Sequence, residues 1–249
     1  MTRTMVLGMR PGFIVAAVVV SLCAVVFRGY IREGAALAVH TYMGKKTVED
    51  RLIEYGDGAR ARLAPDVAAA GVEYPPKAVT LIAIKDKKVM ELWAADKSGA
   101  YRFVRAYTVL AASGRLGPKL MEGDSQVPEG FYDVTLLNAN SLFHLSLRLN
   151  YPNDFDKEMG VLDKRENLGT DVMIHGGAAS IGCLAMGDEV AEELFTLAAD
   201  IGMANVKVII SPVDFRVTDV SGDVMKELPS WSAKLYGNIR ASMKGFKRA

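Results

Sequence analysis

Histidine and cysteine are scarce in this chain. The 249 residues include only three histidines and two cysteines. His40 and His144 lie far from each other and from Cys183 in the sequence, and no Cys-x-x-Cys or His-x-x-x-His pair is present. Cys-x-x-Cys and His-x-x-x-His pairs are typical of zinc sites, and without them we expect no bound metal. No other cofactor is expected.

The chain also lacks an excess of charge of either sign, because its net charge is +1. Residues 1–30 hold three of the 30 basic residues and none of the 29 acidic ones, which leaves 27 basic and 29 acidic residues, or −2. A nucleic-acid-binding domain normally carries a basic surface. A nucleic-acid partner is therefore not expected.

One stretch has no charged residue at all. It covers residues 13–27 and follows Arg3 and Arg10. A basic segment before an apolar run is typical of an export signal or a membrane anchor, so residues 1–38 are predicted to direct export. A buried N-terminal helix is the alternative. Ala36-Leu37-Ala38 has the form of a cleavage site, but charged residues precede it, and both cleavage and anchoring stay open.

The next segment, residues 39–76, is predicted to be a helical lead-in. Thr47 and Asp50 have the spacing of a capping box, and apolar residues follow at helical intervals. Pro75-Pro76 then marks a boundary.

A β-rich pattern follows over residues 77–215. Alternating and β-branched runs predict strands, and one amphipathic helix is expected over residues 188–202. The predicted class is therefore α+β: a β-rich sheet domain with one packed helix. A long loop is expected over 150–170, and a basic extension, as a surface helix or a loose tail, over 216–249. The strands are expected over 78–85, 89–95, 101–111, 130–137, 142–149, 171–175 and 205–211.

Several charged residues are interpreted as solvated. The acidic start of the predicted helix, at residues 188–193, suits the helix dipole, and His144 is interpreted as structural. Five cationic residues that could contribute to substrate binding are interpreted as surface charges: Arg102, Arg105, Arg115, Lys119 and Arg148.

The stretch IHGGAASIGCLAM, residues 174–186, brings a histidine and a cysteine together. Cys183 is the only cysteine of the predicted exported part, and an unpaired cysteine there is either a reactive thiol or a small buried hydrophobe. His175 ends a predicted strand, and the small residues after it allow a sharp turn that can return the chain toward the imidazole. His175 could then act as the base for a Cys183 nucleophile, with Ser180 orienting either group and the amides of Gly182 and Cys183 forming an oxyanion hole.

This arrangement resembles the active-site signature of the L,D-transpeptidase catalytic domain (YkuD) family. In that family a His-Gly pair is followed by Ser-His-Gly-Cys and usually by an arginine two residues later. Ile181 and Ala185 depart from the pattern, and the shortened form is most similar to the YafK branch. QVPEGFY at 126–132 is also similar to the family, and the resemblance covers roughly residues 78–212.

The resemblance implies a cell-envelope enzyme, in the periplasm or anchored to the inner membrane. Cys183 would form a thioester with a diaminopimelate residue of a peptidoglycan stem peptide, His175 would be the base, and Ser180 and the Gly176 backbone would hold the imidazole. An amine acceptor would give a cross-link. Water would give hydrolysis, including release of an envelope protein attached to peptidoglycan. A non-catalytic peptidoglycan-binding module is the alternative from another class.

Overall fold

The computed structural model describes residues 44–248. The predicted export segment, residues 1–38, lies outside this range. Within residues 44–248 no helix combines the length and apolar character needed to span a membrane.

The described part of the chain begins with a helix in three parts: α2 (Val48–Arg51), a π-helical turn η1 (Leu52–Gly56) and α3 (Asp57–Ala69). The predicted capping box is confirmed, because the Thr47 side chain accepts from the Asp50 amide and the Asp50 side chain accepts from the Thr47 amide. The π turn ends at Gly56, and Gly58 follows in the first turn of α3; glycine weakens a helix at both positions. This helix packs on α5 (Asp188–Ile201).

Within residues 44–248, nine strands form one sheet with the order β3-β2-β1-β9-β5-β6-β7-β8-β4. The predicted hairpin between β1 and β2 is confirmed, and β1 also pairs with β9 in parallel. The strands are β1 (Val79–Ile84), β2 (Val89–Ala95), β3 (Tyr101–Thr108), β4 (Ala111–Ala112), β5 (Gly130–Ser141), β6 (His144–Leu149), β7 (Met173–His175), β8 (Leu184–Ala185) and β9 (Val206–Ser211).

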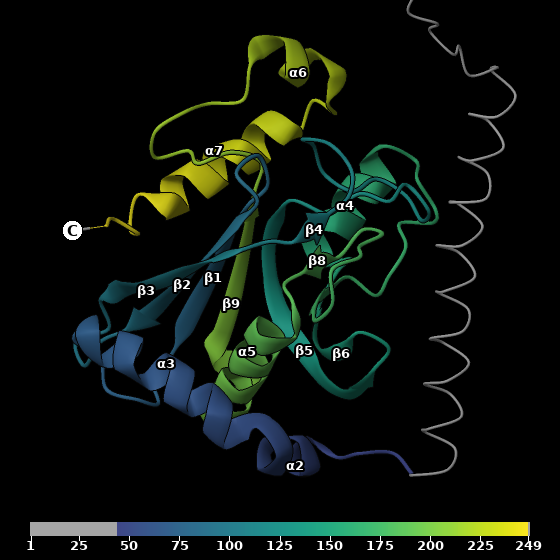
Figure 1. Ribbon diagram of the computed structural model, residues 1–249. Helices are drawn as coiled ribbons and strands as arrows, with labels where there is room; N and C mark the ends of the chain where they lie inside the picture. The colour runs from purple at the N-terminus through teal and green to yellow at the C-terminus, as the bar shows by residue number, and fades with distance from the viewer. Residues whose placement is uncertain (1–43, 249) are drawn as a thin grey trace, which may run out of the picture. The chain divides into compact units, whose positions relative to one another are not determined.

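The sheet curls because one extended segment supplies both of its edges. Residues 101–112 form β3 at one edge and β4 at the other. The twelve-residue strand β5 joins the two halves, since it pairs with β9 at one end and with β6 at the other. Its pairing with β6 has register shifts, and such irregularities bend a strand. The strands therefore wrap around a shared core (Figure 1).

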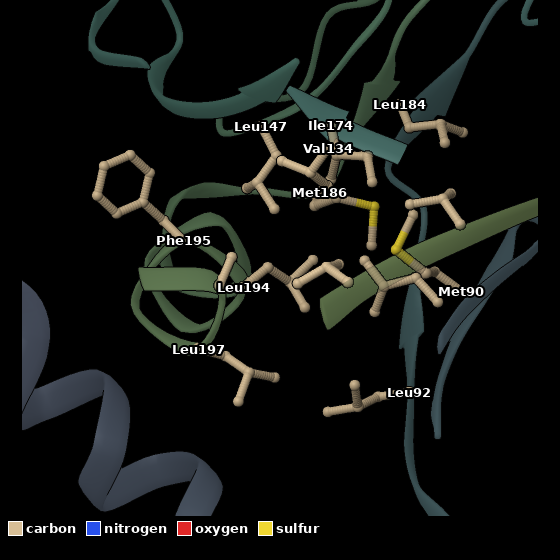
Figure 2. Close-up of a cluster of buried hydrophobic side chains, with 14 of the residues drawn as sticks. Met90, Leu92, Val134, Leu147, Ile174, Leu184, Met186, Leu194, Phe195 and Leu197 are labelled. Atoms are coloured by element: carbon tan, nitrogen blue, oxygen red, sulfur yellow. The ribbon is translucent and has the colours of Figure 1, made fainter. Parts of the chain in front are cut away.

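The main core lies inside the curl, between the strands and α5. Figure 2 shows Leu194, Phe195 and Leu197 of α5 among strand residues such as Leu92 and Ile174. A second cluster covers the opposite face of β1 and β2 and contains Trp93. These strands are buried on both faces, which explains their nearly continuous apolar runs.

The second cluster depends on a helix from the predicted C-terminal extension. In this region α6 (Gly222–Glu227) precedes α7 (Ser232–Met243). Leu235, Ile239 and Met243 of α7 are buried in the cluster. The extension is therefore a packed helix rather than a loose tail.

One other expectation was wrong and another holds only in part. Residues 150–170 contain the helix α4 (Asp154–Leu162), which begins at a capping box formed by Asn153 and Asp156. The acidic start of α5 is solvated only in part, because Asp188 and Glu189 are exposed whereas Glu193 is only 4% exposed. Its carboxylate binds Arg62 of α3 and accepts from the Tyr107 hydroxyl, and these contacts attach the first helix to the domain.

A buried ion pair connects the sheet to the long segment between β4 and β5. Lys85 Nζ lies 2.9 Å from Glu129 Oε1, and both side chains are almost fully buried. The ammonium also donates to two carbonyls, those of Gly117 and Val127. The other Glu129 oxygen accepts from the Tyr236 hydroxyl of α7 at 2.6 Å. This pair therefore fixes residues 117–129.

Candidate active site

His175 and Cys183 project from the outer face of neighbouring strands. β7 and β8 pair in parallel, with Ile174 opposite Leu184 and His175 opposite Ala185. Ile174 and Leu184 point into the core. Because side chains alternate along a strand, His175 faces outward, and continuing the register by one residue puts Cys183 beside Met173 on the same outer face.

The His175 imidazole is fixed by its surroundings. Its side chain is only 2% exposed, and its Nδ1 lies 2.6 Å from the Gly176 carbonyl oxygen. This oxygen can only accept, so Nδ1 carries the proton and Nε2 is the basic nitrogen. The Phe143 ring lies against the imidazole, with 4.7 Å between ring centroids. Burial lowers the pKa of His175, and the hydrogen bond to Gly176 opposes this shift.

Cys183 is half-buried, and its thiol donates to the Asp171 carbonyl at 3.6 Å. Burial raises the pKa of the Cys183 thiol, while a hydrogen bond from the Met173 backbone opposes the shift. Within residues 44–248, the thiol and the imidazole thus hydrogen-bond to backbone groups and not to each other. Neutral thiol and neutral imidazole are the resting forms at neutral pH.

Ser180 shapes the turn that leads into the nucleophile. Its hydroxyl donates to the Cys183 carbonyl at 2.6 Å and accepts from the Cys183 amide at 3.1 Å. Its hydrogen bonds are to the Cys183 backbone, not to the imidazole. Gly182 has φ +90°, which disfavours any other residue, and its amide donates to the Ser113 hydroxyl at 2.6 Å.

The segment between β4 and β5 forms a neighbouring wall that sequence reasoning missed. Ser113 binds Gly182, and a Cβ on Gly182 would lie 3.4 Å from the Gln126 carbonyl oxygen. Lys119 is buried and paired with Asp124, so it is not the surface charge that we expected. No sequence signal marks Ser113, because its proximity to Gly182 depends on the pairing of β4 with β8.

The structure also accounts for His144 and for the question of a metal site. His144 is structural as predicted: its Nε2 lies 3.0 Å from Glu192 and its ring packs against Tyr55. Among residues 44–248, no group of three or more His, Cys, Asp or Glu side chains has the geometry to hold a metal ion.

The tight packing of Gly176 leads to a stability prediction. A Cβ at this position would lie 2.7 Å from both Asp188 Oδ1 and the Phe143 carbonyl oxygen. Gly176→Ala is therefore expected to lower the free energy of unfolding by about 1–3 kcal/mol, measured by urea denaturation. Gly237→Ala is the matched control, since its Cβ meets nothing within 4 Å, and it should stabilise α7 by about 0.5–1 kcal/mol. Equal effects of the two substitutions would contradict the packing argument.

The outer-face histidine and cysteine also lie within a recognised domain. A family model described as the L,D-transpeptidase catalytic domain (YkuD) matches residues 78–210, just over half of the chain. The chain belongs to this family. The L,D-transpeptidase domain thus contains His175, Cys183 and the strands described above, except the last residue of β9.

Sequence relatives point to the same branch. The YafK proteins of Escherichia coli K12 and O157:H7 are each 35% identical to this chain over 143 residues, covering 55% of the chain and 54% of the relative. The resemblance to YafK is therefore confirmed. The chain spans about half the length of these curated relatives.

The solved structures that resemble this chain are less similar in sequence than the YafK proteins. The helical cell shape determining protein Pgp2 of Campylobacter jejuni is 22% identical, with a TM-score of 0.44 over 55% of this chain and 48% of that one. Bd1075 of Bdellovibrio bacteriovorus is 17% identical, with a TM-score of 0.40 over 69% of this chain and 55% of that one.

Proposed function

We propose that this protein is a cysteine acyl-transfer enzyme of the cell envelope that acts on diaminopimelate-containing peptidoglycan stem peptides. The observation that carries the proposal is the placement of His175 and Cys183 on one outer face, two residues apart along β7 and β8, within an L,D-transpeptidase domain. The exported location follows from the same proposal. Membrane attachment depends on whether residues 1–38 are cleaved or retained as an anchor.

The reaction starts from the neutral pair. Rotation of the Cys183 side chain away from the Asp171 carbonyl brings Sγ toward Nε2 of His175, which accepts the thiol proton. Sγ then bonds to the amide carbonyl carbon of the diaminopimelate residue. The C–N bond breaks, and the departing amine takes its proton from the imidazolium. An amine acceptor or water then breaks the thioester and regenerates the thiol.

The oxyanion of the tetrahedral intermediate is placed against the Gly182 amide. Rotation of the Ser113 hydroxyl can free this donor, whereas the Cys183 amide is enclosed by Ser180 within the turn. Once Ser113 has turned away, the Gly182 amide is held in place by the backbone of the turn, and a fixed donor stabilises developing charge effectively. Ser180 is therefore a positioning residue for Cys183, and the Gly176 carbonyl positions the imidazole.

Arg148 is the candidate for holding a substrate carboxylate. It lies opposite Met173, so Arg148, Met173 and Cys183 follow one row across the outer face. Its guanidinium is paired with Asp171 and 41% exposed. Arg148→Gln is expected to raise KM about tenfold with little change in kcat, the loss of one charge-assisted contact. Arg102 forms an exposed pair with Asp96, so Arg102→Gln should leave KM unchanged. Equal KM values for wild type, Arg148→Gln and Arg102→Gln would show that Arg148 does not hold a substrate carboxylate.

The pKa directions predict how the thiol reacts with alkylating agents. Because burial raises the pKa of Cys183, thiolate is scarce at neutral pH, and the alkylation rate by iodoacetamide should still be rising at pH 8.5, near the ordinary cysteine pKa of about 8.5. Peptide mapping distinguishes alkylation of Cys183 from alkylation of Cys23. The same pH series on urea-unfolded protein gives the titration midpoint of an ordinary cysteine. A rate plateau below pH 7 would show a resting thiolate–imidazolium pair and contradict the prediction.

The proposal is tested on sacculi that carry covalently attached proteins. Wild type and Cys183→Ala are incubated with them, and mass spectrometry follows muropeptides and released protein. New diaminopimelate cross-links would assign transpeptidation. Release of protein without new cross-links would assign the hydrolytic amidase. Identical patterns for the two proteins would overturn catalysis on this substrate and favour a peptidoglycan-binding module.

A further inference from the structure

A cavity lies away from Cys183, on the side of the sheet covered by α7. Its volume is about 770 Å³, well within the range of small-molecule sites. It shares no lining residue with the outer face of β7 and β8. Its walls come from β1 to β3, residues 214–217, the end of α7 and the segment after it.

Positive charge dominates this cavity. Its lining includes the cationic residues Lys87, Arg216, Arg240, Lys244, Lys247 and Arg248. The carboxylates that pair with them are Glu91, Asp214 and Asp219. Six cations thus face three carboxylates, which leaves a local surplus of three positive charges in a chain whose net charge is only +1.

The ion pairs order the wall but leave part of the charge available. Arg216 donates to both oxygens of buried Glu91, at 2.9 and 2.8 Å, and to Asp214 at 2.7 Å. Each of these acids is also shared with a second cation. Within residues 44–248, Lys244 and Lys247 have no ion-pair partner. These two ammonium groups carry most of the uncompensated charge.

The rest of the lining is apolar. Ile84, Val89, Ala106 and Phe215 contribute to it, and Val217 is 75% exposed at the rim. A ligand that fits must therefore combine more than one negative charge with an apolar portion that covers these side chains.

We propose that this basic cavity binds a phosphate ester that carries more than one negative charge. A lipid headgroup and a soluble phosphate compound share this chemistry. The charge surplus, the ordered guanidinium and the apolar lining carry the proposal, and it does not depend on the chemistry of Cys183.

The full chain, in mild detergent, is titrated with phenyl phosphate, a soluble phosphate monoester with an apolar ring, by isothermal titration calorimetry. In a second assay, it is reconstituted into phosphatidylcholine vesicles, with or without phosphatidic acid, and quenching of Trp231 and Trp93 fluorescence by a labelled headgroup is followed. Lys244→Glu/Lys247→Glu is expected to weaken binding at least tenfold. The control Lys226→Glu/Lys234→Glu changes the net charge equally at exposed positions outside the cavity, and should bind like wild type.

Each outcome either supports or overturns phosphate-ester binding in the basic cavity. Phenyl phosphate binding lost only in the cavity variant supports the site and assigns a soluble ligand. A response only to phosphatidic acid, lost only in the cavity variant, supports the site and assigns a lipid headgroup. No binding of either probe, or equal binding by the two double variants, overturns the proposal. Thermal unfolding of each variant confirms that a lost signal does not reflect a lost fold.

Discussion

Replacing His175 by alanine is expected to slow acylation of Cys183 by about 100- to 10,000-fold, the range typical of a positioned general base. The effect should be large because little thiolate forms without a base: burial raises the pKa of the thiol, and its proton is held by the Asp171 carbonyl. Acylation is measured by rapid quenching with a stem-peptide substrate, followed by intact-mass spectrometry.

His144→Gln is the matched control for this experiment. His144 lies on the adjacent strand, but its imidazole is committed to Glu192 and Tyr55. Its replacement should change the acylation rate by no more than a few fold. If His175→Ala reacts within threefold of wild type, His175 is not the base and another group must accept the thiol proton.

Removing Lys85 is expected to give the largest loss of stability. Lys85→Met leaves the Glu129 carboxylate buried without its cation, although Tyr236 and the Gly117 amide still donate to it. Breaking one side of a buried pair costs about 3–5 kcal/mol. Urea denaturation should show this loss in the free energy of unfolding. Because Lys85 also holds the Gly117 and Val127 carbonyls, the wall beside Gly182 should loosen as well.

The exposed pair between Lys97 and Glu73 provides the comparison. These side chains are 84% and 74% exposed, and such pairs contribute about 0–1 kcal/mol. Lys97→Met should therefore leave the unfolding free energy within about 0.5 kcal/mol of wild type. Similar losses for Lys97→Met and Lys85→Met would show that the Lys85–Glu129 pair is not energetically special.

Much of the fold could be predicted because local patterns decide it. The capping box at Thr47, the hairpin between β1 and β2 and the amphipathic α5 each follow from residues close together in the sequence. The two-residue strand β8 could not be predicted, because its pairing with β4 and β7 comes from distant segments. The helix α4 was missed because polar residues dominate its segment, although Asn153 and Asp156 provide a recognisable cap.

The residues of the candidate site could likewise be predicted only in part. His175 and Cys183 could be found from the sequence because the short turn between them keeps the pair local. Ser113, Phe143 and Asp171, which contact Gly182, His175 and Cys183 respectively, lie too far along the chain for spacing to reveal them. The charges were misread for a related reason: Lys119 and Glu193 are buried by partners that only the folded chain supplies.

A thioester at Cys183 is the central intermediate of the proposed reaction. A diaminopimelate-containing stem peptide is mixed with the protein, the reaction is quenched in acid, and peptide mapping locates any adduct. We expect a mass increase equal to the acyl donor minus its departing amine, on the peptide that contains Cys183. The adduct should be absent in Cys183→Ala. Turnover of the substrate by Cys183→Ala at the wild-type rate, with no adduct on Cys183 of the wild type, would contradict the account.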